Sequence, residues 1–257
     1  MALQIRQFPC LQDNYGFLIV CSETGACAAI DTPEPARILE EARAAGWRLS
    51  EIWNTHHHWD HAGGNDTVRA ANGARITAPA AEADKIGHVD AAVRPGDRVR
   101  LGALEAQVLD VGGHTLGHIA YWFESEGVAF VGDALFALGC GRLFEGTPQQ
   151  AQAGLARLRD LPPDTVIHCA HEYTQANARF ALSVDPQNAA LIDYAAGVER
   201  LRARGEPTVP TTIERERAAN PFLRWDDAGL RARLGLETAK DWEVYGAVRA
   251  RKDNFKG

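Results

Sequence analysis

Seven consecutive residues, Thr55 to His61, contain four histidines and one aspartate. Neutral imidazole and carboxylate groups are the standard protein ligands of zinc and similar ions. Neighbouring imidazoles gain nothing from their closeness unless a cation lies between them, so this run predicts a metal site. A predicted strand leads into the run, and alternate residues then point to one side. We therefore expect His56 and His58 to share one ion, and Asp60 and His61 to face a second.

Further donors stand at or just after the ends of later predicted strands. The segment Gly113–His118 contains two imidazoles, and Phe130–Asp133 ends in a carboxylate. The segment Val166–Glu172 contains two more imidazoles. Such strand ends can converge on one rim of a sheet. The chain thus supplies enough donors for two metal ions.

Four histidines are expected to have other roles. His88 is isolated and is typical of a surface loop, and His168 lies within a predicted buried strand, which favours a core role. His57 and His118 are interpreted as walls of the site, because a metal-bound imidazole needs a partner that orients its second nitrogen.

The hydrophobic pattern predicts strands with a few helices up to residue 173 and only helices after it. We therefore expect two domains, residues 1–173 and 174–257. The strands expected are 14–20, 26–31, 49–53, 74–78, 98–101, 105–111, 119–123, 128–131 and 165–168. The helices expected are 35–45, 66–71, 148–159, 175–183, 188–204, 228–233 and 240–252.

Composition limits the class of protein. The chain has 257 residues, 46% of them hydrophobic and 24% charged, as in an ordinary soluble protein with a sizeable core. Residues 1–173 contain 13 basic and 22 acidic residues, and the rest contain 14 and 12. The overall net charge of −7 argues against a nucleic-acid partner. The sequence contains no long apolar run, so we expect neither a membrane span nor a signal peptide. Five cysteines without a CxxC pair indicate reduced thiols and a cytoplasmic protein.

Four motifs in order, THHHWDH, GHTLGH, VGDALF and AHEYT, resemble the metallo-β-lactamase-fold superfamily, and within it the hydroxyacylglutathione hydrolases, also called glyoxalase II. The H-x-H-x-D-H pattern alone indicates only the superfamily. Three further segments narrow the resemblance, which covers nearly the whole chain: Gly139–Thr147, His171–Thr174, and Asn220–Arg224 with the basic end at 249–252.

The resemblance implies an α/β fold, an αββα sandwich followed by a small C-terminal helical domain. It also implies two divalent metal ions, with zinc favoured and iron or manganese tolerated. The implied ligands are His56, His58 and His114 for one ion, Asp60, His61 and His171 for the other, and Asp133 for both. Cys140 stands near a position where some β-lactamases of the superfamily use a cysteine ligand, but it is not counted as one.

The same resemblance implies that Arg142, Tyr173, Arg249 and Lys252 bind glutathione. Arg142 stands where the family often has lysine, which keeps the charge and changes the geometry. Phe144 stands where tyrosine is common. We expect the missing hydroxyl to weaken glutathione binding by roughly 0.5–1.5 kcal/mol.

The implied reaction is hydrolysis of S-(2-hydroxyacyl)glutathione, such as S-D-lactoylglutathione, to a 2-hydroxy acid and glutathione. This is the second step of methylglyoxal detoxification. Two metals can lower the pKa of a shared water toward neutrality, which gives a hydroxide nucleophile. Asp60 and Asp133 then act as catalytic ligands. A thiol has a pKa of about 8.5, so the thiolate can leave without a general acid. We expect a monomer, with no nucleic-acid or membrane partner.

Other functions remain open on this fold. An iron-dependent persulfide dioxygenase would need only His56, His114 and Asp133, and the basic helical end argues against it. A lactonase or β-lactamase is disfavoured by the reducing compartment and by Asp133 in place of a cysteine ligand. The acidic charge disfavours a nuclease. A non-catalytic metal-stabilised module is disfavoured because structural sites are usually closed by four protein ligands.

Overall fold

The computed structural model describes residues 2–257, and the chain divides into two compact units. The first unit comprises residues 1–110 and 117–132, and the second comprises residues 111–116 and 133–257. The domain boundary expected between residues 173 and 174 stays a prediction.

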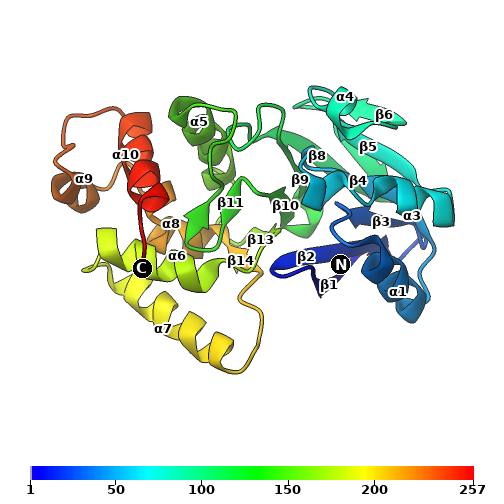
Figure 1. Cartoon of the computed structure of the whole chain (residues 1–257), viewed down its shortest axis with the longest axis horizontal. Helices are drawn as coiled ribbons and strands as arrows, with labels where there is room; N and C mark the ends of the chain where they lie inside the picture. The colour runs from blue at the N-terminus through cyan, green and yellow to red at the C-terminus, as the bar shows by residue number, and fades with distance from the viewer. Residues whose placement is uncertain (1) are drawn as a thin grey trace. The chain divides into compact units, whose positions relative to one another are not determined.

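The first unit contains a six-stranded sheet in which the strands follow chain order (Figure 1). Its strands are β1 (Leu3–Cys10), β2 (Asn14–Cys21), β3 (Cys27–Ile30), β4 (Leu49–Trp53), β5 (Arg75–Pro79) and β6 (Ala91–Val93). Strands β1 to β3 are antiparallel, and β3 to β6 run parallel. The structure confirms the predicted hairpin of β2 and β3. Strand β1 was not predicted from the sequence.

Four antiparallel strands form a second layer in the same unit. They are β7 (Arg98–Leu101), β8 (Leu104–Asp110), β9 (Ile119–Phe123) and β10 (Val128–Gly132). Aromatic side chains join the two layers. Trp53 stacks on Phe123 with ring centroids 5.9 Å apart, and Phe17 packs edge-on against Phe130 at 5.5 Å. This packing fixes the end of β4, where the histidine run begins.

Two helices cover the first sheet. They are α1 (Pro35–Ala45) and α3 (Asn65–Asn72), and Ile38 and Val68 belong to the core cluster of that sheet. Helix α1 has the predicted limits, because Pro35 suits its first turn and Gly46 ends it at φ 69°. The short helices α2 (Trp59–Ala62) and α4 (Ala83–Ile86) were not predicted.

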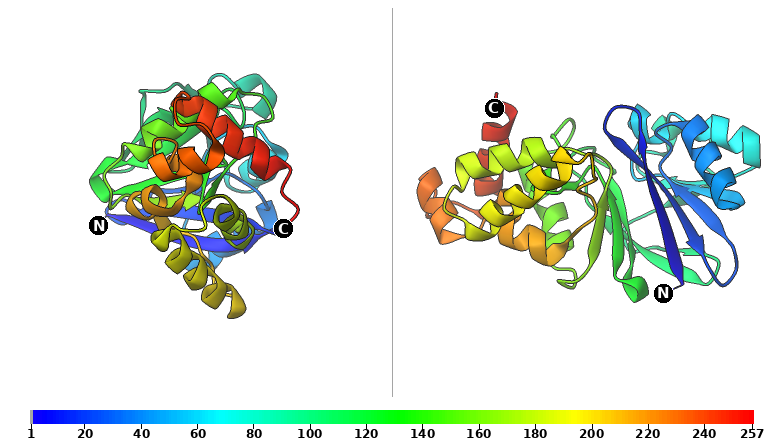
Figure 2. Two further views of the ribbon diagram at one scale, coloured as in Figure 1. Left: turned by 90° about the vertical axis from the view of Figure 1, so that its left-hand side faces the viewer. Right: turned by 90° about the horizontal axis from the view of Figure 1, so that it is seen from below.

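The second unit is mainly helical. Its longer helices are α5 (Pro148–Arg159), α6 (Thr174–Val184), α7 (Ala189–Ala203) and α10 (Asp241–Asp253), with the shorter α8 (Ile213–Ala219), η2 (Pro221–Leu223) and α9 (Ala228–Leu234). Helices α6 and α7 lie side by side (Figure 2). The unit also contains the hairpin of β11 (Leu135–Phe136) and β12 (Gly139–Cys140), and strand β13 (Val166–Cys169).

One sequence expectation about this unit is wrong. Residues 174–257 contain a strand, β14 (Thr211–Thr212), which pairs antiparallel with β13. Two residues are too few to produce a periodic pattern, so only the tertiary pairing reveals this strand. Across residues 2–257, no helix combines the length and the apolar character that crossing a bilayer would require.

Candidate metal centre

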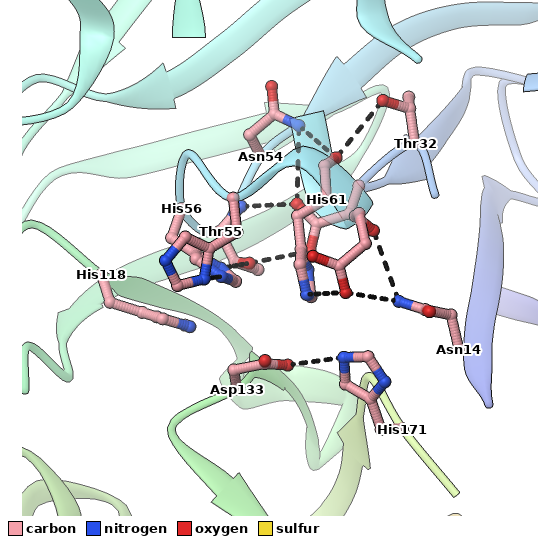
Figure 3. Close-up of polar contacts among 12 residues, drawn as sticks. Asn14, Thr32, Asn54, Thr55, His56, His61, His118, Asp133 and His171 are labelled. Atoms are coloured by element: carbon pink, nitrogen blue, oxygen red, sulfur yellow. Dashed lines mark hydrogen bonds and ion pairs between the residues drawn. The ribbon is translucent and has the colours of Figure 1, made fainter. Parts of the chain in front are cut away.

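The first unit places the histidine run in the loop after β4 and in helix α2. His56 and His61 are buried, with exposed fractions of 0% and 1%. Both are labelled in Figure 3. The His56 Nε2 atom lies 3.1 Å from His58 Nδ1, and His61 Nε2 lies 3.6 Å from Asp60 Oδ2. The Asn14 side-chain amide donates to Asp60 Oδ2 at 3.0 Å. The predicted pairs, His56 with His58 and Asp60 with His61, therefore lie together.

The second unit places one carboxylate against two imidazoles. Asp133 Oδ2 lies 3.4 Å from His114 Nε2, and Asp133 Oδ1 lies 3.3 Å from His171 Nε2. Figure 3 marks the contact between Asp133 and His171 with a dashed line. Asp133 stands between β10 and β11, and His171 follows β13. All three side chains are buried. The carboxylate can therefore share a cation with each imidazole.

The spacing of these donors fits a metal ion. Two ligands of a tetrahedral zinc with bonds of about 2.0–2.1 Å lie about 3.3 Å apart. The four donor separations given above, from 3.1 to 3.6 Å, fall around this value. Each unit thus carries imidazole and carboxylate groups suited to holding a divalent metal.

Asp31, at the end of β3, supports the donors of the first unit. Its carboxylate accepts hydrogen bonds from Thr55 N at 2.8 Å and Thr55 Oγ1 at 2.7 Å, and lies 2.8 Å from His61 Nδ1. Because an aspartate accepts here, Nδ1 of His61 carries the proton and Nε2 keeps its lone pair for a metal. His114 is oriented in the same way, with Nδ1 2.7 Å from the Arg142 carbonyl oxygen.

Glu82 orients the middle histidine of the run. Its buried carboxylate accepts from the His57 backbone N–H at 2.7 Å and from the Gly117 N–H at 2.8 Å, and lies 2.7 Å from His57 Nδ1. The carboxylate therefore connects the histidine run to the loop before β9. Sequence reasoning identified neither Asp31 nor Glu82, because neither acid belongs to a local motif.

The remaining histidines agree with their interpretation. The His118 ring is buried and stacks on His56 at 4.4 Å, as expected for a wall. His168 is buried, and its burial lowers the pKa to about 4, so it is a neutral core residue. His88 is exposed and lies 3.1 Å from the Asp66 carboxylate.

Next to its metal donors, the second unit contains a pocket lined by cationic and aromatic side chains. The lining residues are His114, Asp133, Phe136, Cys140, Arg142, Phe144, Tyr173, Ala176, Asn177, Arg249 and Lys252, around a cavity of 350 Å³. The four residues expected to bind glutathione are all among them. Phe144 is 61% exposed, and the Arg142 guanidinium lies 6.0 Å from its ring.

Arg249 is more constrained than a surface cation. It is only 6% exposed, and its Nη1 donates to the Cys140 carbonyl at 3.0 Å. Its Nε and Nη2 donate to Asp253 Oδ1 at 3.1 and 2.8 Å. Lys252 donates to the Ala176 carbonyl at 3.3 Å. Arg249 is thus held rigidly at the pocket wall, which limits the entropy lost when an anion binds.

The comparisons with known proteins agree with this geometry. Residues 20–171 match the model of the metallo-beta-lactamase superfamily, and residues 172–255 match the model of the hydroxyacylglutathione hydrolase C-terminus. The structure is similar to ETHE1 from Myxococcus xanthus, with a TM-score of 0.70, 26% identity, and coverage of 96% of this chain and 90% of that one. It also resembles the BLEG-1 B3 metallo-beta-lactamase, with a TM-score of 0.67, 18% identity, and coverage of 86% and 99%.

Fold and donor set thus define a metallo-beta-lactamase-fold protein, as expected. The hydroxyacylglutathione hydrolase of Maricaulis maris is 58% identical over 98% of this chain and 99% of its own length. That of Erythrobacter litoralis is 53% identical over 98% and 100%. The chain belongs to the hydroxyacylglutathione hydrolase family.

Proposed function

We propose that the protein hydrolyses S-(2-hydroxyacyl)glutathione thioesters, such as S-D-lactoylglutathione, to a 2-hydroxy acid and glutathione. The observation that carries the proposal is the pocket of the second unit. In one cavity it combines two metal donors, His114 and Asp133, with the cations Arg142, Arg249 and Lys252. Glutathione carries carboxylates that these cations can bind, while the donors serve the reacting end of the same molecule.

The ligand assignment completes the proposal. His56, His58 and His114 would hold one divalent ion, Asp60, His61 and His171 would hold the other, and Asp133 would serve both. Zinc is the ion proposed, because imidazole and carboxylate suit it. When bound, such ions lower the pKa of water and polarise a carbonyl oxygen. The chain's own groups orient the ligands: Asp31 through His61, and the Arg142 carbonyl through His114.

Localisation, metabolic step and oligomeric state belong to the same proposal. All five cysteines are free and buried, in keeping with a cytoplasmic, reducing environment that would also contain glutathione. We place the reaction as the second step of methylglyoxal detoxification, in a monomeric protein. The family of its relatives and the match to the hydrolase C-terminus favour this hydrolase over a persulfide dioxygenase, lactonase or β-lactamase.

The test of the proposal compares substrates. Protein of known metal content is incubated separately with S-D-lactoylglutathione and with a coenzyme A thioester. In a third assay it is incubated with glutathione persulfide while oxygen uptake is recorded. We expect loss of the glutathione thioester absorbance and no oxygen uptake. Oxygen uptake without thioester hydrolysis would instead support the dioxygenase.

Replacing Phe144 tests the glutathione contact missing from this chain. Phe144→Tyr adds a hydroxyl at the pocket rim, and one hydrogen bond contributes about 0.5–1.5 kcal/mol, so KM for S-D-lactoylglutathione should fall by about 2- to 12-fold. Steady-state kinetics measure the change. Phe144→Leu is the control. It removes the ring without adding a hydrogen-bond donor, so it should not lower KM. An unchanged or higher KM in Phe144→Tyr would contradict the assignment.

The charge of Lys252 should make substrate binding depend on pH. Burial, followed by the nearby Arg249 charge, lowers the pKa of Lys252 to about 8. The ammonium therefore loses its proton as the pH rises through about 8, below the ordinary lysine value of 10.5. A bound carboxylate favours the protonated form, so binding above this pH requires uptake of a proton. We expect KM to rise between about pH 7 and about pH 9.5.

The matched control for this pH dependence is Lys252→Arg. Its guanidinium stays charged throughout the range, so its KM should vary less with pH than that of the wild type. Both profiles are measured with S-D-lactoylglutathione. Equal slopes for the two proteins would show that Lys252 does not carry the effect.

A further inference from the structure

The turn between β11 and β12 is buried and lacks a third strand. These strands form a sheet of two, and Ala137 and Leu138 in the turn are both 0% exposed. Leu138 has a φ of 58°, which is uncommon for a residue other than glycine. Buried backbone groups require hydrogen-bond partners, and the short ladder leaves several of them for other segments to supply.

Two asparagines bind the carbonyl groups of this turn. Asn220 Nδ2 donates to the carbonyl oxygens of Phe136 at 3.2 Å and Gly139 at 3.0 Å. Asn177 Nδ2 donates to the Ala137 carbonyl at 3.1 Å. Asn177 lies in α6 and Asn220 directly before η2, so two helical segments hold one turn.

A buried glutamate binds the N–H group of the turn. Glu216 of α8 is 0% exposed, and its Oε2 accepts from Leu138 N at 2.8 Å and lies 2.9 Å from Asn220 Nδ2. Its Oε1 accepts from Tyr194 Oη at 3.0 Å and Thr211 Oγ1 at 2.7 Å. The two oxygens thus contact different segments: Oε2 faces the turn, and Oε1 faces the helices and β14. Burial of a carboxylate is costly without such donors.

The segments on both sides of this turn form the pocket wall. Asp133 comes just before β11, and Arg142 comes just after β12, and both line the cavity. Cys140, at the end of β12, accepts from Arg249 through its carbonyl. A shift of the turn would therefore move the Cys140 carbonyl that accepts from Arg249 and the backbone that leads into Arg142.

We propose that Asn177, Glu216 and Asn220 are positioning residues, which hold the β11–β12 turn so that Arg142 and Arg249 meet the glutathione part of the substrate. The inference rests on the proposed function and extends it to three side chains of the surrounding helices. A purely structural role would lower stability without a selective effect on substrate binding.

The test uses three variants of the full, metal-loaded chain. Asn220→Ala removes two hydrogen bonds to carbonyl groups of the turn. Asn177→Ala removes one such hydrogen bond and does not touch the contacts of Glu216. We expect KM for S-D-lactoylglutathione to rise roughly tenfold in Asn220→Ala, and less in Asn177→Ala, while kcat stays within about threefold. Calorimetry with glutathione should show a parallel loss of affinity. Metal content should not change.

Tyr194→Phe is the matched control. It removes a hydrogen bond to the other oxygen of the same carboxylate, so it should lower the melting temperature and leave KM unchanged. An unchanged KM in both asparagine variants, or an equal rise of KM in Tyr194→Phe, would overturn the inference while the wild type remained active. Failure of the wild type to hydrolyse the thioester would instead remove the proposed function, and this inference with it.

Discussion

Asp133→Asn should reduce kcat/KM for S-D-lactoylglutathione by roughly 10³-fold or more. The two oxygens of Asp133 face different imidazoles, Nε2 of His114 and Nε2 of His171. An asparagine offers one acceptor oxygen and one NH₂ group, so it cannot serve two cations. Metal ions contribute several kcal/mol to stabilisation of the transition state, which corresponds to a loss of this size. Steady-state kinetics on metal-analysed protein measure the effect.

The control for this prediction is an exposed aspartate. Asp66→Asn makes the same chemical change at a surface carboxylate paired with His88, and its activity should stay within about twofold of wild type. Metal content per chain distinguishes loss of a ligand from loss of the fold. Near-normal activity of Asp133→Asn with wild-type metal content would refute the shared-ligand role.

Asp31→Asn should weaken metal binding by about 10- to 100-fold. The substitution keeps the shape, and asparagine tolerates the φ of 58° found at this position. The Asn oxygen can still accept from Thr55, but its NH₂ group then faces His61 Nδ1. That contact favours a proton on Nε2 of His61, which is the nitrogen needed for a metal. Competition with a chromophoric chelator measures the affinity.

Adding excess metal distinguishes weaker metal binding by Asp31→Asn from unfolding of the variant. Activity of Asp31→Asn should recover in part when metal is added, because the ligands themselves remain. Asp90→Asn is the matched control, since Asp90 accepts from Ile76 N and Arg69 in the same unit. It should cost stability and leave metal affinity unchanged. Equal metal affinities for wild type and Asp31→Asn would contradict the tautomer argument.

The sequence predicted the features that depend on local spacing. Residues 55–61 reveal their donors because the ligands are neighbours in the chain, and helix α1 has a proline at its start and a glycine at its end. The pairing of His56 with His58 follows from the same local order.

The sequence could not reveal the residues that act through distant contacts. Asp31 and Thr55 are 24 positions apart, and Glu82 and Gly117 are 35 apart. Glu216 contacts Leu138 over 78 positions. A single acid in a strand end or helix has no periodic signal, so only the folded contacts show what it orients. The same reason explains why β14 was not predicted.

The most direct test of the central claim is a metal titration of the metal-free protein, with S-D-lactoylglutathione hydrolysis followed at each step. We predict that activity rises to a maximum at about two zinc ions per chain and disappears with chelator. Hydrolysis by the metal-free protein, or no hydrolysis with two ions bound, would contradict the account.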